Sequence, residues 1–240
     1  VLLGLREVGL LEATDDVWEH MASTLDAVAE ECRPDSASFV NPAKVAALAL
    51  AETIPIALGD GPVAGVAARR AASMLSRTSR IPAAAGELPH SAGEVVACFD
   101  GPYATGDGWN ATTDRGPAAD GGRDIFADPF LDAPAQTPLG LWLLGRDELG
   151  SMAGHVSTLA SDAGVRVVDC FARGEEPLVD LAHLVGRVDF TATYLAIGLG
   201  LDPSRSPHLA DLREQVFTEI KDRTLETDMS VPVRHDRWWY

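Results

Sequence analysis

The clearest alternation of hydrophobic and polar positions lies between residues 53 and 94. Ile54–Leu58 is an apolar run that ends at the turn residues Gly59–Gly61, which is typical of a parallel strand covered on both faces. From Pro62 to Thr78 the apolar residues recur at helical spacing, and the proline suits the first position of a helix. Ile81–Ala85 is a second apolar run. The stretch therefore predicts a strand, an amphipathic helix and a second strand parallel to the first.

Three later apolar runs extend this alternation along the chain. Val95–Phe99, Leu139–Leu144 and Val165–Phe171 are predicted to be strands. A connection between parallel strands has to be covered by a helix on one face of the sheet or the other. We therefore expect an α/β fold, a three-layer αβα sandwich around a parallel sheet of about five strands, with a flavodoxin-like (Rossmann-like) strand order as the simplest arrangement.

Capping signals and helical periodicity predict the remaining helices. Thr14 can cap a helix that ends near Cys32, and Asn41 followed by Pro42 repeats this type of start for a short helix. Further helices are expected over Asp147–Ala163, from Pro177 to Gly198 with an interruption near Gly186, and over roughly Pro207–Lys221.

The pattern also divides the chain into regions. Residues 1–40 are predicted to be a helical connector, whose leucine-rich start suggests a packing partner in an upstream domain. Residues 41–216 form the expected α/β domain, and within it residues 102–138 are a Gly- and Asp-rich surface excursion. Residues 217–240 form a C-terminal tail that ends in three aromatic residues, and we expect these to be docked or in an interface.

Charge and cysteine content narrow the classes of function. The 240 residues carry a formal net charge of -17, which argues against nucleic acid and against an anionic membrane as partners. No apolar run is long enough to cross a bilayer, and a secretory signal is not supported. The three cysteines are odd in number and widely spaced, which favours free thiols in a cytoplasmic protein.

No motif indicates a cofactor or a metal. Gly59–Gly61 lacks the third glycine of a dinucleotide fingerprint, and neither a phosphate-binding P-loop nor a pair of histidines at metal-ligand spacing is found. The Asp and Asn residues of the 102–138 excursion do not have the spacing of a calcium loop. We expect no cofactor and no metal.

Candidate chemistry gathers at the end of the second predicted strand, because open α/β sheets bind ligands at their carboxyl edge. His90 follows that strand, between Glu87 and Glu94, and is either an ordinary loop histidine or a proton shuttle. Arg70 and Arg77 share one flank of the preceding helix, where they are either solvated or available to bind phosphate.

Four segments carry a resemblance to a known family. In chain order they are NPAK (Asn41–Lys44), TIPIALG (Thr53–Gly59), IPAAAGELP (Ile81–Pro89) and DFTATYLAIGLGLDPS (Asp189–Ser204). In this order the chain resembles the carboxyl-terminal sugar isomerase (SIS) domain of bifunctional phosphoglucose/phosphomannose isomerases, and is most similar to their divergent TobH-like members. The resemblance covers about Asn41 to Val216 except for the Gly- and Asp-rich excursion.

The resemblance implies a phosphosugar site and an isomerisation of aldose to ketose through an enediol, which requires a base and a ring-opening histidine. The base position of the family motif is occupied here by Arg77, which is always protonated and cannot act as a base. The histidine motif is one residue shorter, so His90 could substitute from a shifted position. The catalytic candidates are therefore His90 and Glu87. Candidates for substrate binding are Gly59, Asp60, Gly61, Arg70, Arg77, Glu94 and Arg213, the last near the position of a lysine in the family.

Two functions remain open at this point. The first is a phosphosugar-binding SIS domain of a glucose-6-phosphate/mannose-6-phosphate isomerase-like protein. The second is a catalytically silent module that senses a sugar phosphate or holds a dimer together. In both, the partner is a small sugar phosphate, and the leucine-rich start and aromatic tail favour a homodimer.

Overall fold

The computed structural model describes residues 2–104, 137–146, 151–173 and 176–226. Most of the expected surface excursion and the end of the C-terminal tail lie outside these residues. The chain divides into two compact units, residues 1–203 and residues 204–240. The described elements, in chain order, are α1 (Leu2–Glu7), α2 (Asp15–Glu31), α3 (Pro42–Leu50), β1 (Ile54–Asp60), α4 (Gly61–Met74), the π-helix η1 (Leu75–Ser79), β2 (Ala84–Leu88), α5 (Ala92–Cys98), β3 (Leu139–Arg146), α7 (Ser151–Asp162), β4 (Arg166–Ala172), α8 (Pro177–Gly198) and α9 (Pro207–Glu226).

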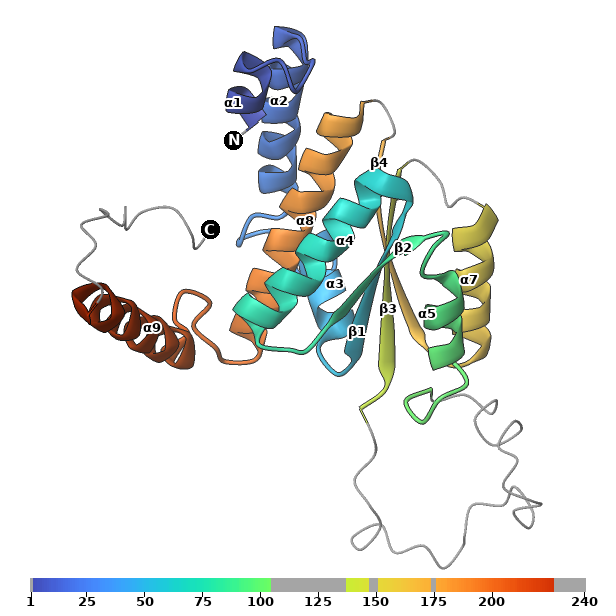
Figure 1. The fold of residues 1–240 in the computed structure, drawn as a ribbon. Helices are drawn as coiled ribbons and strands as arrows, with labels where there is room; N and C mark the ends of the chain where they lie inside the picture. Colours follow the sequence, from blue (N-terminus) through green and yellow to red (C-terminus); the bar gives the residue numbers. More distant parts are fainter. Residues whose placement is uncertain (1, 105–136, 147–150, 174–175, 227–240) are drawn as a thin grey trace, which may run out of the picture. The chain divides into compact units, whose positions relative to one another are not determined.

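The first unit contains a four-stranded sheet in the order β2-β1-β3-β4, with all neighbouring strands parallel. Helices cover both faces of the sheet (Figure 1). The α/β fold and the three helix–sheet–helix layers are therefore confirmed. The strand order agrees with the first four strands of a flavodoxin-like sheet.

The prediction of a strand over Val95–Phe99 was wrong. This is why the described sheet has four strands instead of the expected five. These residues fall in and just after helix α5, in which Glu94 stands in the first turn. Val95 and Phe99 are four residues apart and both buried, which is the spacing of one helical face. A short apolar run does not distinguish a strand from a buried helix by periodicity alone.

Each face of the sheet packs against its own apolar cluster. On one face, Ala57 and Trp142 pack with α3, α4 and α8. On the other face, Leu58 and Leu141 pack with α5 and α7. Because neighbouring residues of a strand point to opposite faces, the continuous apolar run of each central strand serves both clusters.

Helix α8 runs without a break through Gly186, so the expected interruption there is wrong. A Cβ at Gly186 would lie 3.1 Å from the side chain of Val28 and 3.5 Å from that of Leu25. The glycine is explained by the close approach of α2 to α8 rather than by a helix end. Val28 of α2 and Cys32, the residue after α2, pack against Ala43 of α3 and Tyr194 of α8.

The second unit contains helix α9, which is longer than expected at its carboxyl end. Among the described residues no helix is long and apolar enough to cross a membrane. Cys32, Cys98 and Cys170 are free, as predicted, and Cys98 is exposed to solvent.

Candidate functional site

The candidate site lies at the carboxyl ends of β1 and β2, where the register of the strands brings the sequence-predicted residues together. Gly59 is paired with Glu87 and Asp60 with Leu88. Gly61 follows directly with φ +82°, a conformation that favours glycine, and begins helix α4. Residues predicted from two separate segments therefore share one edge of the sheet.

Gly59 and Gly65 allow α4 to pack close to these strands. A Cβ at Gly59 would lie within 2.3 Å of backbone atoms of Ala64 and Gly65. A Cβ at Gly65 would lie 2.4 Å from the Glu87 carboxylate oxygen Oε2. The Glu87 side chain thus occupies the space left by a missing side chain on the helix.

Arg69 holds the carboxylate of Glu87. Its Nη1 donates a 3.1 Å hydrogen bond to Oε2 of Glu87, and the side chains are 60% and 25% exposed, respectively. Arg70 and Arg77 were selected from the sequence, and Arg69 was not. Arg69 lies one helical turn after Gly65, whose missing side chain leaves room for the Glu87 carboxylate, and this spacing on one face of α4 is the signal that could have found it.

His90 is exposed in the turn after β2, and Glu94 is exposed in the first turn of α5. The turn is held by hydrogen bonds between its ends. Glu87 N donates to Ser91 Oγ at 3.2 Å, and Ser91 N donates to Glu87 O at 2.9 Å. His90 therefore extends from a fixed turn beside Glu87 and has access to solvent.

Arg77 does not lie at this edge. Helix α4 starts at the carboxyl end of β1 and runs back, so η1 lies near the amino end of β2. Ser79 confirms this position, since its hydroxyl donates a 2.7 Å hydrogen bond to Ala192 O, close to the carboxyl end of α8. The expectation that Arg77 and His90 share one rim is wrong, because a helix that connects parallel strands is antiparallel to them.

Arg70 joins two helices. Its Nε and Nη2 donate to the two carboxylate oxygens of Asp189 at 3.0 and 2.8 Å, which is a bidentate pair between α4 and α8. The hydrogen bonds from Arg70 to Asp189 raise the pKa of Arg70, against a smaller effect of burial. The guanidinium is thus already occupied by a partner within the chain.

Arg213 is half-buried in α9, in the second unit.

Residues 39–216 match the family described as the bacterial phospho-glucose isomerase C-terminal SIS domain. The chain belongs to this family.

One solved structure similar to this SIS domain chain is that of a glucose-6-phosphate isomerase like protein from Thermus thermophilus. The TM-score is 0.61 at 20% sequence identity, and the match covers 88% of the present chain and 58% of that protein. The chain thus spans a little over half the length of this relative, and the likeness supports the fold. A search of curated proteins found no match.

Further charged residues of the SIS domain lie at the carboxyl ends of β3 and β4. Arg146, the last residue of β3, donates from Nε to Asp180 Oδ2 at 2.5 Å, and Asp180 is buried in the first turn of α8. Arg173 follows β4 directly and is exposed. Sequence reasoning did not select these residues, because β3 and β4 end in no recognisable motif.

The edge at β1 and β2 offers carboxylates and an imidazole. Within the described ranges, no group of three or more His, Cys, Asp or Glu residues could hold a metal ion. Glu87, paired with Arg69, can accept hydrogen bonds from the hydroxyl groups of a ligand, and the imidazole of His90 can donate or accept a hydrogen bond. The arrangement suits a polyhydroxylated ligand and proton transfer.

Proposed function

We propose that this chain is the phosphosugar-binding SIS domain of a glucose-6-phosphate/mannose-6-phosphate isomerase-like protein, and that the ligand binds at the carboxyl ends of β1 and β2. The observation that carries the proposal is the pairing of Gly59 with Glu87 at the carboxyl edge, in a domain that belongs to the bacterial phospho-glucose isomerase family. In this proposal Asp60 and Glu94 bind hydroxyl groups, and Gly59 and Gly61 let the ligand approach the backbone.

The reaction would interconvert an aldose phosphate and a ketose phosphate by moving a proton between adjacent carbons. A base has to remove the proton to give the enediol, and Glu87 is the carboxylate available beside His90. The hydrogen bond from Arg69 would hold this carboxylate in place for the step. His90 would donate a proton to the ring oxygen as the sugar ring opens and the anomeric hydroxyl loses its proton to solvent, and Glu87 would later return its proton to the neighbouring carbon.

An alternative is a catalytically silent domain that binds a sugar phosphate as a sensor or serves in dimerisation. It is favoured by Arg77, which stands where the family motif carries its base glutamate and cannot take a proton. Its position near the amino end of β2 also means that Arg77 can meet His90 only through a second copy of the chain.

A coupled assay of the full-length protein with glucose 6-phosphate, fructose 6-phosphate and mannose 6-phosphate separates these functions. The isomerase proposal expects turnover, reduced at least about a hundredfold by Glu87→Gln and by His90→Ala. Turnover that neither substitution changes would contradict the assigned site. Absence of turnover with all three sugars would leave the silent alternative.

Binding is measured separately by the thermal stabilisation that each sugar phosphate produces. We expect glucose 6-phosphate to raise the Tm of the wild-type chain, and Glu87→Gln to reduce this shift. Arg69→Gln tests the same site, because it removes the partner of Glu87 without adding bulk. A ligand-induced shift that is the same in wild type, Glu87→Gln and Arg69→Gln would exclude the β1–β2 edge as the site.

Sensitivity to Arg70→Ala, Arg77→Ala or Arg213→Ala tests the remaining substrate-binding candidates. A loss of binding with Arg77→Ala requires that a second copy supplies this residue.

We further propose that the protein is a homodimer of the TobH-like type and is cytoplasmic, in keeping with its free cysteines. Sedimentation of a monomer at micromolar concentration would contradict the dimer.

A further inference from the structure

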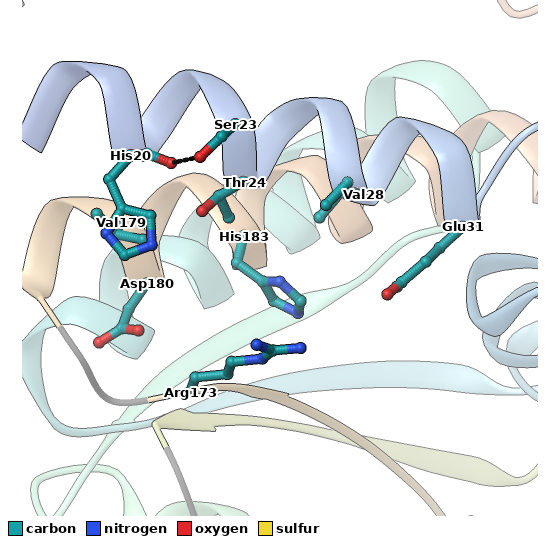
Figure 2. Close-up of a pocket in the computed structure, with 10 residues that line it drawn as sticks. His20, Ser23, Thr24, Val28, Glu31, Arg173, Val179, Asp180 and His183 are labelled. Atoms are coloured by element: carbon teal, nitrogen blue, oxygen red, sulfur yellow. Dashed lines mark hydrogen bonds between the residues drawn. The ribbon is translucent and has the colours of Figure 1, made fainter.

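A cavity of about 220 Å³ lies on the other side of the carboxyl edge, between α2, α8 and the end of β4. Its polar lining includes His20, Thr24, Glu31, Arg173 and His183. Figure 2 shows His183 of α8 and Arg173 pointing toward each other, with Glu31 reaching toward them from the end of α2. None of these residues belongs to the site proposed at β1 and β2.

The charges around this cavity do not balance. Glu31 is paired with Nη2 of Arg187 at 2.6 Å, and Asp180 with Nε of Arg146 at 2.5 Å. Arg173 forms no hydrogen bond or ion pair within the part of the chain that the structure describes. Among the described residues, one positive charge at the cavity therefore has no partner, although the whole chain carries a net charge of -17.

The neighbouring polar groups are mostly donors. Burial, followed by the positive charges of Arg187 and Arg173, lowers the pKa of His183, so its imidazole is neutral near pH 7 and carries one N–H. The Thr24 hydroxyl has no partner among the described residues, whereas Ser23 Oγ already donates to His20 O at 2.9 Å. Thr24, His183 and Arg173 are therefore three hydrogen-bond donors that line one cavity.

A smaller cavity of about 110 Å³ shares His183 and is lined also by Arg187 and Trp142. Nε of Arg187 and Nε1 of Trp142 are both buried, and within the described ranges neither has a hydrogen-bond partner. Two unpartnered N–H donors therefore belong to residues that line this smaller cavity. Asp169 also lines it, has no ion-pair partner among the described residues, and would repel an anion. The carboxylates that line the larger cavity, Glu31 and Asp180, are each paired with an arginine, which favours the larger cavity as the place where an anion is held.

We propose that the cavity between α2 and α8 is a second binding site, separate from the β1–β2 edge, that takes a phosphate-sized oxyanion on Arg173, His183 and Thr24. The oxyanion is either free phosphate or the phosphate group of a sugar phosphate. At about 220 Å³ the cavity is smaller than the roughly 300–1,000 Å³ of sites for larger ligands, so a whole nucleotide does not fit. The fork of the arginine matches an oxyanion, and the carboxylates nearby are already paired.

The test is a titration with inorganic phosphate at constant ionic strength, with the Tm of the full chain as the readout. We expect a saturable stabilisation that is weakened at least about tenfold in apparent affinity by Arg173→Ala. Arg166→Ala is the matched control, because Arg166 is also an exposed arginine but stands at the opposite, amino end of β4. Stabilisation that is absent in the wild type, or equal in Arg173→Ala, would overturn the proposal.

Thr24→Val provides a second, milder test, since it removes the hydroxyl and keeps the shape. It is expected to weaken phosphate binding several-fold, and wild-type affinity would exclude Thr24 from the site.

Repeating the titration with glucose 6-phosphate identifies the source of the oxyanion. If the Tm shift produced by glucose 6-phosphate is lost in Arg173→Ala but kept in Glu87→Gln, the sugar phosphate binds at the second site. If the Tm shift is kept in Arg173→Ala but lost in Glu87→Gln, this ligand binds at the β1–β2 edge alone. The inorganic phosphate result stands apart from the proposed isomerase site in either case.

Discussion

At the scale of single residues, Gly59 decides how closely α4 can approach β1. Because a Cβ here would lie 2.2 Å from the backbone of Ala64, Gly59→Ala forces the helix away from the strand. We expect a loss of about 3 kcal/mol in the free energy of unfolding, measured by denaturant titration. Gly93→Ala in α5 is the control, since a Cβ there meets nothing within 4 Å, and we expect it to change stability by less than about 1 kcal/mol. Equal effects of the two substitutions would contradict this account of the packing.

His183 gives the stability a dependence on pH. Its folded-state pKa lies below the usual value of 6.5, chiefly because the ring is partly buried. As the pH falls below about 6.5, the unfolded chain therefore takes up this proton before the folded chain does, and stability decreases toward acid. His183→Gln is expected to make the free energy of unfolding fall less between pH 7 and pH 5, as measured by urea titration at each pH. The same slope in wild type and variant would contradict the prediction, and His208→Gln, at a fully exposed histidine, is the control.

At the scale of secondary-structure elements, α3 depends on its cap. Asn41 is fully buried, its Oδ1 accepts from Ala43 N at 3.1 Å and from Lys44 N at 3.0 Å, and its Nδ2 donates to Arg33 O at 3.1 Å. Asn41→Ala leaves these groups without partners, and we expect it to cost about 2 kcal/mol in thermal or urea unfolding. Thr14 holds the equivalent position in α2 but makes no side-chain capping bond. Thr14→Ala is therefore expected to cost less than about 0.5 kcal/mol, and similar losses at both positions would contradict the role of the cap.

The sequence was sufficient to predict those elements whose signals are local. The starts of α2 and α3 and the apolar runs of β1, β3 and β4 were predicted, because a few neighbouring residues determine each of them. Strand β2 lies three residues later than expected, since the Ala-rich segment before it has no side-chain pattern that marks a boundary. Helix α5 was missed for the reason that short apolar runs fit both a strand and a helical face.

At the scale of the whole molecule, the positions of site residues depend on chain direction and on contacts distant in sequence. Gly59, Asp60 and Glu87 could be predicted together, because parallel strands end at one edge. Arg77 was placed at the wrong edge, since its placement overlooked that α4 runs back along the sheet. The cavity of Arg173 and His183 depends on α2, which lies more than a hundred residues away in sequence, and no local pattern indicates this contact.

The division of the chain leads to a prediction for the molecule as a whole. Residues 1–203 include all four described strands and both apolar clusters that cover the sheet, and residues 204–240 form a separate unit. Because the described core of the first unit contains no residue beyond position 203, a chain of residues 1–203 should fold alone. We expect its cooperative thermal transition, followed by circular dichroism, to lie within about 4 °C of that of the full chain. An aggregated product, or a broad transition without a cooperative step, would mean that residues 204–240 are part of the same folding unit.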